Sequence, residues 1–316
     1  MAILPAILAI LFPASAKAQE AASPAATNET APRIVFVGNS FTFGAGSPVR
    51  LYRAETVNDL NGEGIGGVPA LFKMFSRQAG RDFDVSLETA AGKNLDFHVQ
   101  NKAAVLDQHW DFAVLQGHSM LDPKKPGDPA LLAKSGRELT ELLRRRNPKV
   151  EILLVATWSR ADQVYPKTGH WHGKPIEQMA RDVRTGYNFA AAAAGGAIHD
   201  VIPVGEAWNR AFRTGVADPN PYDGISARQL NLWGRDEYHA SAFGYYLEAL
   251  MIFGDLTGLD PRSLGKNERA AWELGFSPEQ ASALQQVAFD ELSATKGRAK
   301  LQPFKPANLR PPISSR

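Results

Sequence analysis

Short, nearly continuous runs of apolar residues recur along the chain, and most of them lead into Gly, Ser or Asn and then into a helix-like pattern. Runs of this kind are typical of strands buried in a parallel sheet. Strands that alternate with helices predict a doubly wound α/β sheet covered by helices on both faces. The five predicted strands are Ile34–Val37, Phe83–Glu88, Phe112–Leu115, Glu151–Ala156 and Ala197–Pro203.

Apolar positions spaced three and four residues apart predict helices between these strands. A later helix is predicted to begin at Ser277-Pro278-Glu279-Gln280, which has the form of a capping box, and to run to about Leu292. The helices predicted between the strands are Val68–Ala79, Leu95–Asp107, Pro129–Arg146 and Pro175–Ala194.

The two ends of the chain differ in composition from its body. An apolar run over Ala2–Phe12 precedes the small-residue triplet Ala16-Lys17-Ala18, which is the pattern of a secretory signal peptide. We expect cleavage after Ala18 and a periplasmic or secreted protein. Because no Lys or Arg precedes the apolar run, an apolar tail without an export function is the alternative. The predicted divisions are a signal peptide at 1–18, a linker at 19–32, a catalytic domain at 33–295 and a basic, proline-containing tail at 296–316.

Composition narrows the class of protein. The 316 residues are 44% apolar, enough for a sizeable core, and they include no cysteine, which excludes disulfides, thiolate metal sites and cysteine nucleophiles. Without Lys17 and the six cations of the tail, 28 cations face 33 anions over residues 19–295, a balance that argues against nucleic acid as a partner. No apolar run after residue 20 is long enough to predict a transmembrane segment in the mature chain.

A serine follows the first predicted strand directly, in the segment Gly38-Asn39-Ser40-Phe41-Thr42. Ligands of open parallel sheets bind beyond the carboxyl ends of the strands, so this position is suited to a nucleophile. A tight turn there exposes the hydroxyl and turns the backbone N–H of the serine towards a reacting carbonyl. Taken alone, Ser40 is equally suited to capping the segment that follows it.

A second block, Asp236-Glu237-Tyr238-His239, precedes the last apolar helix pattern of the predicted domain. An Asp three residues before a His allows the carboxylate to hold one ring nitrogen while the other acts as a base. The alternative is that Asp236 only caps the following helix. The two blocks together favour a serine hydrolase.

The strand followed by G-N-S-F-T and the D-x-x-H before a final helix resemble the first and last sequence blocks of the SGNH (GDSL-like) hydrolases. The segment is most similar to the GNSF-type subgroup of unassigned function, with Asn39 where the founding pattern has Asp. The resemblance covers about Arg33 to Gly258. It implies a flavodoxin-like three-layer α/β/α sandwich with a central five-stranded parallel sheet and a triad of Ser40, His239 and Asp236, without a cofactor.

The resemblance further implies three donors for a developing oxyanion. The first two map to the N–H groups of Ser40 and of Gly92, which lies in Thr89-Ala90-Ala91-Gly92-Lys93-Asn94 after the second strand. The third departs from the pattern, because Gln116-Gly117-His118-Ser119 holds no asparagine. Gln116 is the expected substitute, since its amide offers the same donor, and the Q-G-x-S arrangement resembles that of SGNH-like carbohydrate acetylesterases. His118 and Ser119 are the alternatives.

The aromatic, polar segment after the fourth strand, residues 158–174, is expected at the rim of the site. We expect Trp158, Trp171 and also Tyr165 to line a sugar-accepting groove; an ordinary loop covering the core is the alternative. Asn39 and His118 complete the expected substrate-binding residues. His170 and His172 have no third ligand at a recognisable metal spacing, so no metal site is expected.

These observations predict an exported esterase that hydrolyses O-acyl groups, acetyl or short-chain, on carbohydrates or small molecules. Two alternatives keep the same fold: an exported carbohydrate-binding protein without turnover, and an O-acyltransferase that uses the same serine. Natural substrate and oligomeric state have no sequence signal.

Overall fold

The computed structural model describes Met1, residues 31–296 and residues 301–306. Within these ranges, six parallel strands form one sheet in the order β2-β3-β1-β4-β5-β6. The strands are β1 (Arg33–Gly38), β2 (Asn58–Asp59), β3 (Asp84–Thr89), β4 (Phe112–Leu115), β5 (Glu151–Ala156) and β6 (Asp200–Pro203).

The predicted fold class is confirmed, and the predicted number of strands is corrected by one. The five predicted strands are all present, and their order, β3-β1-β4-β5-β6, is the doubly wound order in which the chain reverses direction beside β1. The additional strand, β2, is two residues long and pairs with Ser86 and Leu87 at the sheet edge. Its sequence, Asn58-Asp59, holds no apolar run, so nothing in the hydropathy pattern indicates it.

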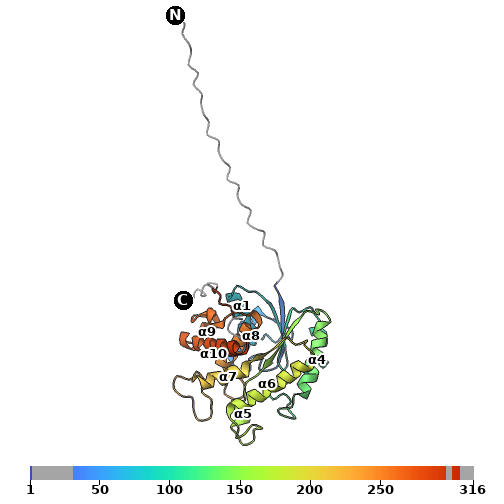
Figure 1. Ribbon diagram of the computed structural model, residues 1–316, viewed down its shortest axis with the longest axis vertical. Coiled ribbons are helices and arrows are strands. Elements are labelled where there is room, and N and C mark those ends of the chain that lie inside the picture. The colour runs from blue at the N-terminus through green and yellow to red at the C-terminus, as the bar shows by residue number, and fades with distance from the viewer. Residues whose placement is uncertain (2–30, 297–300, 307–316) are drawn as a thin grey trace. The chain divides into compact units, whose positions relative to one another are not determined.

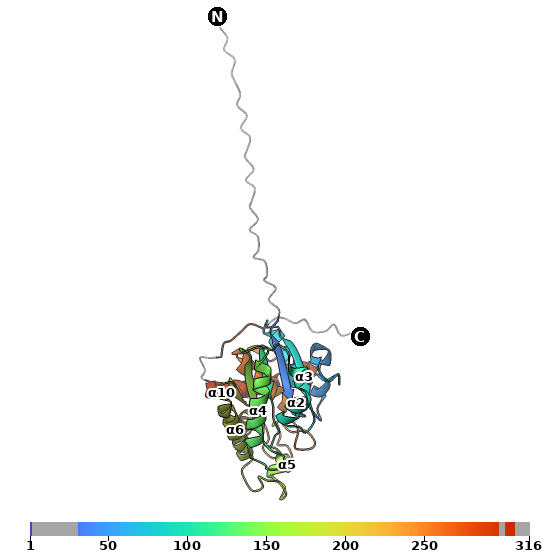
Figure 2. The ribbon, with the colours of Figure 1, turned by 90° about the vertical axis from the view of Figure 1, so that its right-hand side faces the viewer.

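Helices cover both faces of the sheet and give three layers (Figures 1 and 2). One layer contains α2 (Leu95–Asn101), α4 (Ala130–Arg144) and α6 (Ile176–Ala193), which contact one another in that order. The other contains α1 (Gly67–Gln78), α8 (Ala242–Thr257) and α10 (Pro278–Lys296), with α8 in contact with both of the others. The remaining α-helices among the described residues are α3 (Ala103–Leu106), α5 (Ala161–Val164), α7 (Val204–Arg213) and α9 (Arg269–Glu273).

Most helix predictions are confirmed within a few residues, and one is wrong in its continuity. The segment predicted as one helix over Leu95–Asp107 is broken at Lys102, whose backbone leaves the helical region and separates α2 from α3. The predicted capping box opens α10: the Ser277 N–H donates to Gln280 Oε1 at 2.8 Å, and the Gln280 N–H donates to Ser277 Oγ at 3.2 Å.

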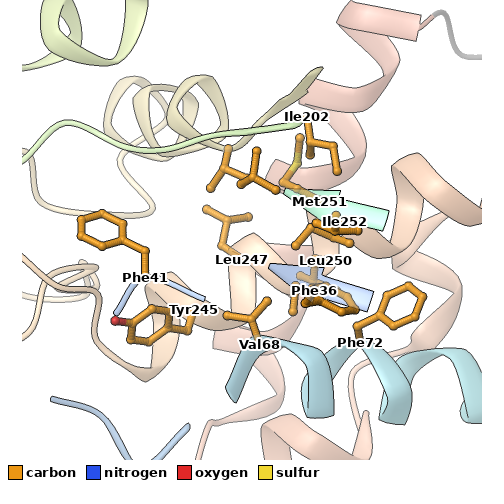
Figure 3. Packing of buried hydrophobic residues seen from close by; sticks show 14 of the residues in the cluster. Phe36, Phe41, Val68, Phe72, Ile202, Tyr245, Leu247, Leu250, Met251 and Ile252 are labelled. Atoms are coloured by element: carbon orange, nitrogen blue, oxygen red, sulfur yellow. The ribbon is translucent and has the colours of Figure 1, made fainter. Parts of the chain in front are cut away.

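Helix α8 is the centre of its layer. Its residues from Gly244 to Asp255 are all buried, which is the pattern of a helix enclosed by other elements on every side. Figure 3 shows Leu250 of α8 close to Phe36 of β1, which in turn packs against Phe72 of α1 at 5.6 Å between ring centroids. Each fully buried large apolar side chain of this kind stabilises the fold by about 1.5–3 kcal/mol. The helix that follows the D-x-x-H block is thereby fixed to the sheet.

The ends of the chain are described only in part. The predicted signal peptide and most of the predicted linker, residues 2–30, lie outside the described residues, as do 297–300 and 307–316 of the predicted tail. Of the tail, Gln302 is described beside Gly258, to whose carbonyl its N–H donates at 2.8 Å. Among the described residues, no helix combines the length and the apolar character that spanning a bilayer requires.

Gly38 ends β1 at a position that leaves no room for a side chain. A β-carbon there would collide with Thr42 Oγ1 and lie 2.9 Å from Gln116 Oε1. We expect Gly38→Ala to lower the free energy of unfolding by about 1–3 kcal/mol, because overpacking forces neighbours apart. Urea denaturation measures this. In the control, Gly136→Ala within α4, the added methyl meets nothing within 4 Å, and stability should hold or rise. Equal stability of the two variants would contradict the expectation.

Candidate active site

Ser40 lies in the turn where the chain leaves β1. It is 6% exposed, and its carbonyl accepts hydrogen bonds from the Ala45 N–H at 3.0 Å and the Tyr245 hydroxyl at 3.2 Å. Within the described residues, neither its own N–H nor its own hydroxyl has a hydrogen-bond partner. As far as the structure describes the chain, a hydroxyl and a backbone N–H are therefore both uncommitted at the carboxyl edge of the sheet.

The side chain of Asn39 joins the Ser40 turn to two other loops. Its Nδ2 donates to the Lys93 carbonyl at 2.9 Å and to the Gly117 carbonyl at 3.2 Å, and its Oδ1 accepts from the Phe41 N–H at 3.1 Å. Asn39 is 2% exposed, so these hydrogen bonds form away from water. Both the nitrogen and the oxygen of the Asn39 amide are therefore hydrogen-bonded to protein atoms.

Gln116, the residue directly after β4, braces the same turn. Its Oε1 accepts from the Asn39 N–H at 3.1 Å and from the Thr42 hydroxyl at 3.0 Å, and its Nε2 donates to the Gly117 carbonyl. Because the Asn39 N–H can only donate, it fixes which end of the Gln116 amide faces the turn. The side chain expected to donate to an oxyanion thus already makes protein contacts at both ends.

In the D-x-x-H block, Asp236–His239, the two carboxylate oxygens of Asp236 have different partners. Asp236 Oδ2 lies 2.6 Å from His239 Nδ1, while Oδ1 accepts from the backbone N–H groups of His239 at 2.9 Å and Tyr238 at 3.1 Å. Burial alone would raise the pKa of Asp236, but these hydrogen bonds outweigh it and hold the pKa below its ordinary value. The other ring nitrogen, His239 Nε2, is buried without a partner among the described residues.

Contacts of α8 bring the D-x-x-H block to the Ser40 turn. The Tyr245 hydroxyl, on the second turn of α8, reaches both the Ser40 carbonyl and the Ala45 carbonyl, the latter at 3.1 Å. The Phe41 ring lies 5.6 Å from the His239 ring, centroid to centroid. Segments some two hundred residues apart are thus side by side, although no hydrogen bond joins Ser40 to His239 in the part of the chain that is described.

The loop after β3 carries Gly92 to the same edge. The Ala90 N–H donates to the Gly38 carbonyl at 3.0 Å, and the Lys93 carbonyl accepts from Asn39, so both sides of the glycine are tied to the Ser40 turn. Gly92 has φ of 68°, a conformation that favours glycine, although a β-carbon would meet nothing within 4 Å. Among the described residues its N–H has no acceptor.

His118, in the loop after β4, is held in one tautomer. Its Nδ1 accepts from the Met120 N–H at 3.2 Å, so the proton of the neutral ring is on Nε2. Burial, and to a lesser degree the positive charge of Arg160, lowers the pKa of His118 to about 4. The ring is therefore neutral at physiological pH and offers an N–H donor without a charge.

Several solved structures are similar to this chain. A DUF4886 family protein from Bacteroides uniformis is similar over 85% of this chain and 96% of its own, with 19% identity and a TM-score of 0.59. A candidate SGNH hydrolase from Slackia heliotrinireducens covers 72% of this chain and 100% of its own, at 20% identity and a TM-score of 0.46. A family 3 carbohydrate esterase from Clostridium thermocellum covers 71% and 94%, at 16% identity and a TM-score of 0.43. No family model and no curated protein matches the sequence.

The chain shares its α/β fold with the DUF4886 family protein, at a TM-score of 0.59. The strand order, the serine directly after β1 and the D-x-x-H block before α8 agree with the arrangement that the sequence blocks implied.

The two tryptophans expected to line a groove are both buried. Trp158 is 0% exposed and is stacked between Phe41, at 4.3 Å, and Trp208, at 4.7 Å. Trp171 is 4% exposed, and its Nε1 donates to Asp182 at 2.8 Å. Both faces of the Trp158 indole are covered, and this ring supports the Ser40 turn. Trp171 lines a separate cavity of about 450 Å³, together with His170 and Asp182.

Tyr165 lies nearer the surface than the two tryptophans. Its hydroxyl donates to the Pro219 carbonyl at 2.7 Å, and its ring packs edge-on against the exposed Tyr222 ring at 5.8 Å. In the same rim segment, His172 Nδ1 contacts the Tyr165 carbonyl at 3.0 Å. Among the described residues, no group of three or more His, Asp and Glu side chains could hold a metal ion.

Arg160 and Ser119 form a polar contact behind His118. The Arg160 guanidinium makes a two-pronged pair with Asp162, at 2.9 and 2.6 Å, and lies 3.6 Å above the Tyr238 ring. One of its nitrogens donates to Ser119 Oγ at 3.4 Å. Ser119, one of the alternative oxyanion donors, is therefore engaged by an arginine, and it is only 1% exposed.

Three residues that support the candidate site had no role in the sequence-based expectations. Tyr245 holds the Ser40 carbonyl, Tyr187 of α6 accepts the Gly117 N–H at 2.9 Å, and Asn94 Oδ1 accepts the His118 N–H at 3.0 Å. Tyr245 was within reach of sequence reasoning, because it lies only six residues after His239, near the start of α8. The partners of Tyr187 and Asn94 come from distant segments.

The low pKa of His118 predicts a pH dependence of stability. The unfolded chain takes up this proton near pH 6.5, but the folded protein does so only near pH 4, so stability present above pH 6.5 is lost as the pH falls towards 4. We expect His118→Gln to flatten the fall in unfolding free energy over this range by about 2–3 kcal/mol. Urea denaturation at several pH values measures it. His109→Gln, at an exposed histidine, is the control; identical curves for both variants would contradict the assignment.

Proposed function

We propose that this chain is a serine esterase in which Ser40 is the nucleophile, His239 the base and Asp236 the group that orients the base. The observation that carries the proposal is the buried Nε2 of His239, which has no partner in the described ranges. Asp236 holds the Nδ1 of the same ring, and α8 ties this block to the Ser40 turn. Within the described residues the Ser40 hydroxyl has no competing partner. This is the pairing that a weakly acidic alcohol needs to become nucleophilic.

In the first half of the proposed reaction, His239 Nε2 takes the proton of the Ser40 hydroxyl while Ser40 Oγ forms a bond to the ester carbonyl carbon. The resulting oxyanion collapses, the bond from carbon to the leaving alcohol breaks, and the imidazolium returns its proton to that alcohol. In the second half, water loses a proton to His239 and attacks the acyl carbon; the bond from that carbon to Ser40 Oγ then breaks, the acid leaves, and His239 returns the proton to Ser40 Oγ. The negative charge of Asp236 stabilises the imidazolium in both halves.

For the oxyanion we propose the N–H groups of Ser40 and Gly92, together with His118 Nε2–H. Both backbone groups lack an acceptor among the described residues, and His118 presents a neutral N–H on the adjoining loop. Gln116 was the expected third donor, but its contacts with Asn39, Thr42 and Gly117 give it a bracing role. A donor that is already fixed in place costs no reorganisation when charge develops.

As substrates we propose O-acyl esters with a short acyl group, and as location the periplasm or the exterior, in line with the predicted signal peptide. An O-acyltransferase would use the same acyl-enzyme and differ only in its acceptor, and a binding protein would lack the acyl-enzyme altogether. Labelling of the serine separates the binding protein from the two enzymes.

Replacement of the proposed nucleophile tests the triad directly. We expect Ser40→Ala to abolish hydrolysis of 4-nitrophenyl acetate and Asp236→Asn to lower kcat by about 10³–10⁴, because the ring then loses its orienting carboxylate. A fluorophosphonate should label wild type on Ser40 but not His239→Ala, as shown by mass spectrometry of the labelled peptide. Full activity of Ser40→Ala would exclude the esterase mechanism, and an unlabelled wild-type serine would favour a binding protein.

The third oxyanion donor is identified by comparing two variants. We expect His118→Ala to lower kcat by about 10²–10³. Gln116→Leu should lower both kcat and stability, the latter by about 1–3 kcal/mol, because the Asn39 N–H and Thr42 hydroxyl lose their buried acceptor. Steady-state kinetics and urea denaturation of both variants measure this. A Gln116→Leu protein with wild-type stability and a kcat loss of 10²-fold or more would instead make Gln116 the donor.

A further inference from the structure

A cavity of about 610 Å³ opens beside the D-x-x-H block, and it is large enough to hold a small ligand. Three segments that are distant in sequence form its walls. The lining residues that bear on its chemistry are Pro48, Asn231, Arg235, Glu237, Phe243 and Phe276.

Two walls of this cavity adjoin the segments that carry the proposed nucleophile and the proposed base. Glu237 lies between Asp236 and His239, and Gly46–Pro48 follows directly after Ala45, whose N–H donates to the Ser40 carbonyl. The Tyr245 hydroxyl, which contacts the carbonyls of both Ser40 and Ala45, holds the two walls together. A ligand in the cavity would therefore sit next to the segments that carry the proposed nucleophile and base.

The lining offers three polar side-chain groups without an internal partner. The Glu237 carboxylate, the Arg235 guanidinium and the Asn231 Nδ2 have no hydrogen-bond or ion-pair partner among the described residues. They comprise an acceptor, a charged donor and a neutral donor. By contrast, the Ser47 and Ser241 hydroxyls in the same walls are engaged as helix caps. The open groups therefore suit a ligand that both donates and accepts hydrogen bonds.

An aromatic pair forms the apolar part of the lining. The Phe243 and Phe276 rings lie 4.3 Å apart, centroid to centroid, and Pro48 also lines the cavity. Apolar ring surface beside unpaired polar groups suits a sugar, which has an apolar C–H face and hydroxyls around its edge. A simple acyl chain would leave the Glu237 and Arg235 side chains without partners while removing water from them, which costs free energy.

The backbone of Glu237 is held in an uncommon conformation. Its φ is 51°, in the left-handed region that few residues other than Gly, Asn and Asp adopt. Burial, followed by the nearby carboxylates of Asp236 and Asp162, raises the pKa of Glu237 above its ordinary value. Backbone strain and repulsion from like charges both work against a glutamate here, and hydroxyl donors from a ligand would relieve the second of these.

We propose that this cavity binds the glycosyl part of an acylated carbohydrate, with Glu237 accepting hydrogen bonds from sugar hydroxyls and the Phe243–Phe276 pair packing against the sugar ring. The inference rests on the proposed esterase function and deepens it, because it assigns the sugar to the alcohol side of the scissile ester.

The first test compares substrates that differ in their alcohol. Mono-acetylated methyl glycosides of glucose, galactose, xylose and N-acetylglucosamine are compared with 4-nitrophenyl acetate, which carries no sugar. Two cavity variants are tested: Glu237→Gln, and Ala242→Phe, whose added ring fills the cavity from the first residue of α8. We expect each to lower kcat/KM for the preferred glycoside by about tenfold or more relative to kcat/KM for 4-nitrophenyl acetate. The loss should appear as a higher KM for the glycoside. Glu138→Gln on α4 is the matched control and should keep the wild-type ratio.

An unchanged ratio in both cavity variants would overturn the proposal, provided that circular dichroism shows both to be folded. A selective loss on 4-nitrophenyl octanoate in Ala242→Phe would overturn it as well, because the cavity would then hold the acyl chain.

The second test does not depend on turnover, so it separates failure of the cavity from failure of the esterase function. The deacetylated methyl glycosides are titrated calorimetrically into the Ser40→Ala protein. Saturable binding that weakens about tenfold when Glu237→Gln or Ala242→Phe is added supports the cavity, even if wild type hydrolyses neither kind of ester. Absence of binding to any of the glycosides, or binding that neither addition weakens, overturns it.

Discussion

The candidate site depends most on the hydrogen bonds of the buried Asn39 amide. It donates to carbonyls of the loops that follow β3 and β4 and accepts from the backbone of its own turn. An aspartate, which the founding SGNH pattern has here, could not make the same contacts, because an ionised carboxylate only accepts and would face two carbonyl oxygens. In this chain the relative positions of Ser40, Gly92 and Gly117 therefore require an amide at position 39.

The hydrophobic core continues without a break into the site. Phe41, immediately after the proposed nucleophile, stacks on Trp158, and Trp158 stacks in turn on Trp208 of α7 at an angle of 3°. The Trp158 Nε1 also donates to the Tyr238 carbonyl at 3.3 Å, next to the proposed base. Close-packed aromatic rings tolerate little displacement, so the Ser40 turn and the D-x-x-H block are positioned by one rigid column of side chains. Trp158, one of the two tryptophans expected to contact a ligand, is part of this support.

The parts of the fold and site that sequence predicted are those with a local signal. Buried strands such as Ile34–Val37 are continuous apolar runs, and Asp236 and His239 are close enough in sequence for their spacing to indicate a contact. The short strand Asn58–Asp59 has no such signal, because it pairs through its backbone alone. The role of Gln116 was equally hidden: its contacts with Asn39 and Thr42 arise only when β1 and β4 lie side by side.

Rigidity in the D-x-x-H block comes from hydrogen bonding more than from burial. The Asp236 side chain is 49% exposed, which would ordinarily leave a carboxylate free to rotate and water to compete for it. Here one oxygen accepts two backbone N–H groups, so the other can point only at the His239 ring. The left-handed backbone of Glu237 allows the chain to turn tightly enough for both contacts, and its N–H donates to the Gly234 carbonyl at 3.2 Å within that turn. The two residues between Asp and His thus set the geometry of the pair, and one of them also lines the adjoining cavity.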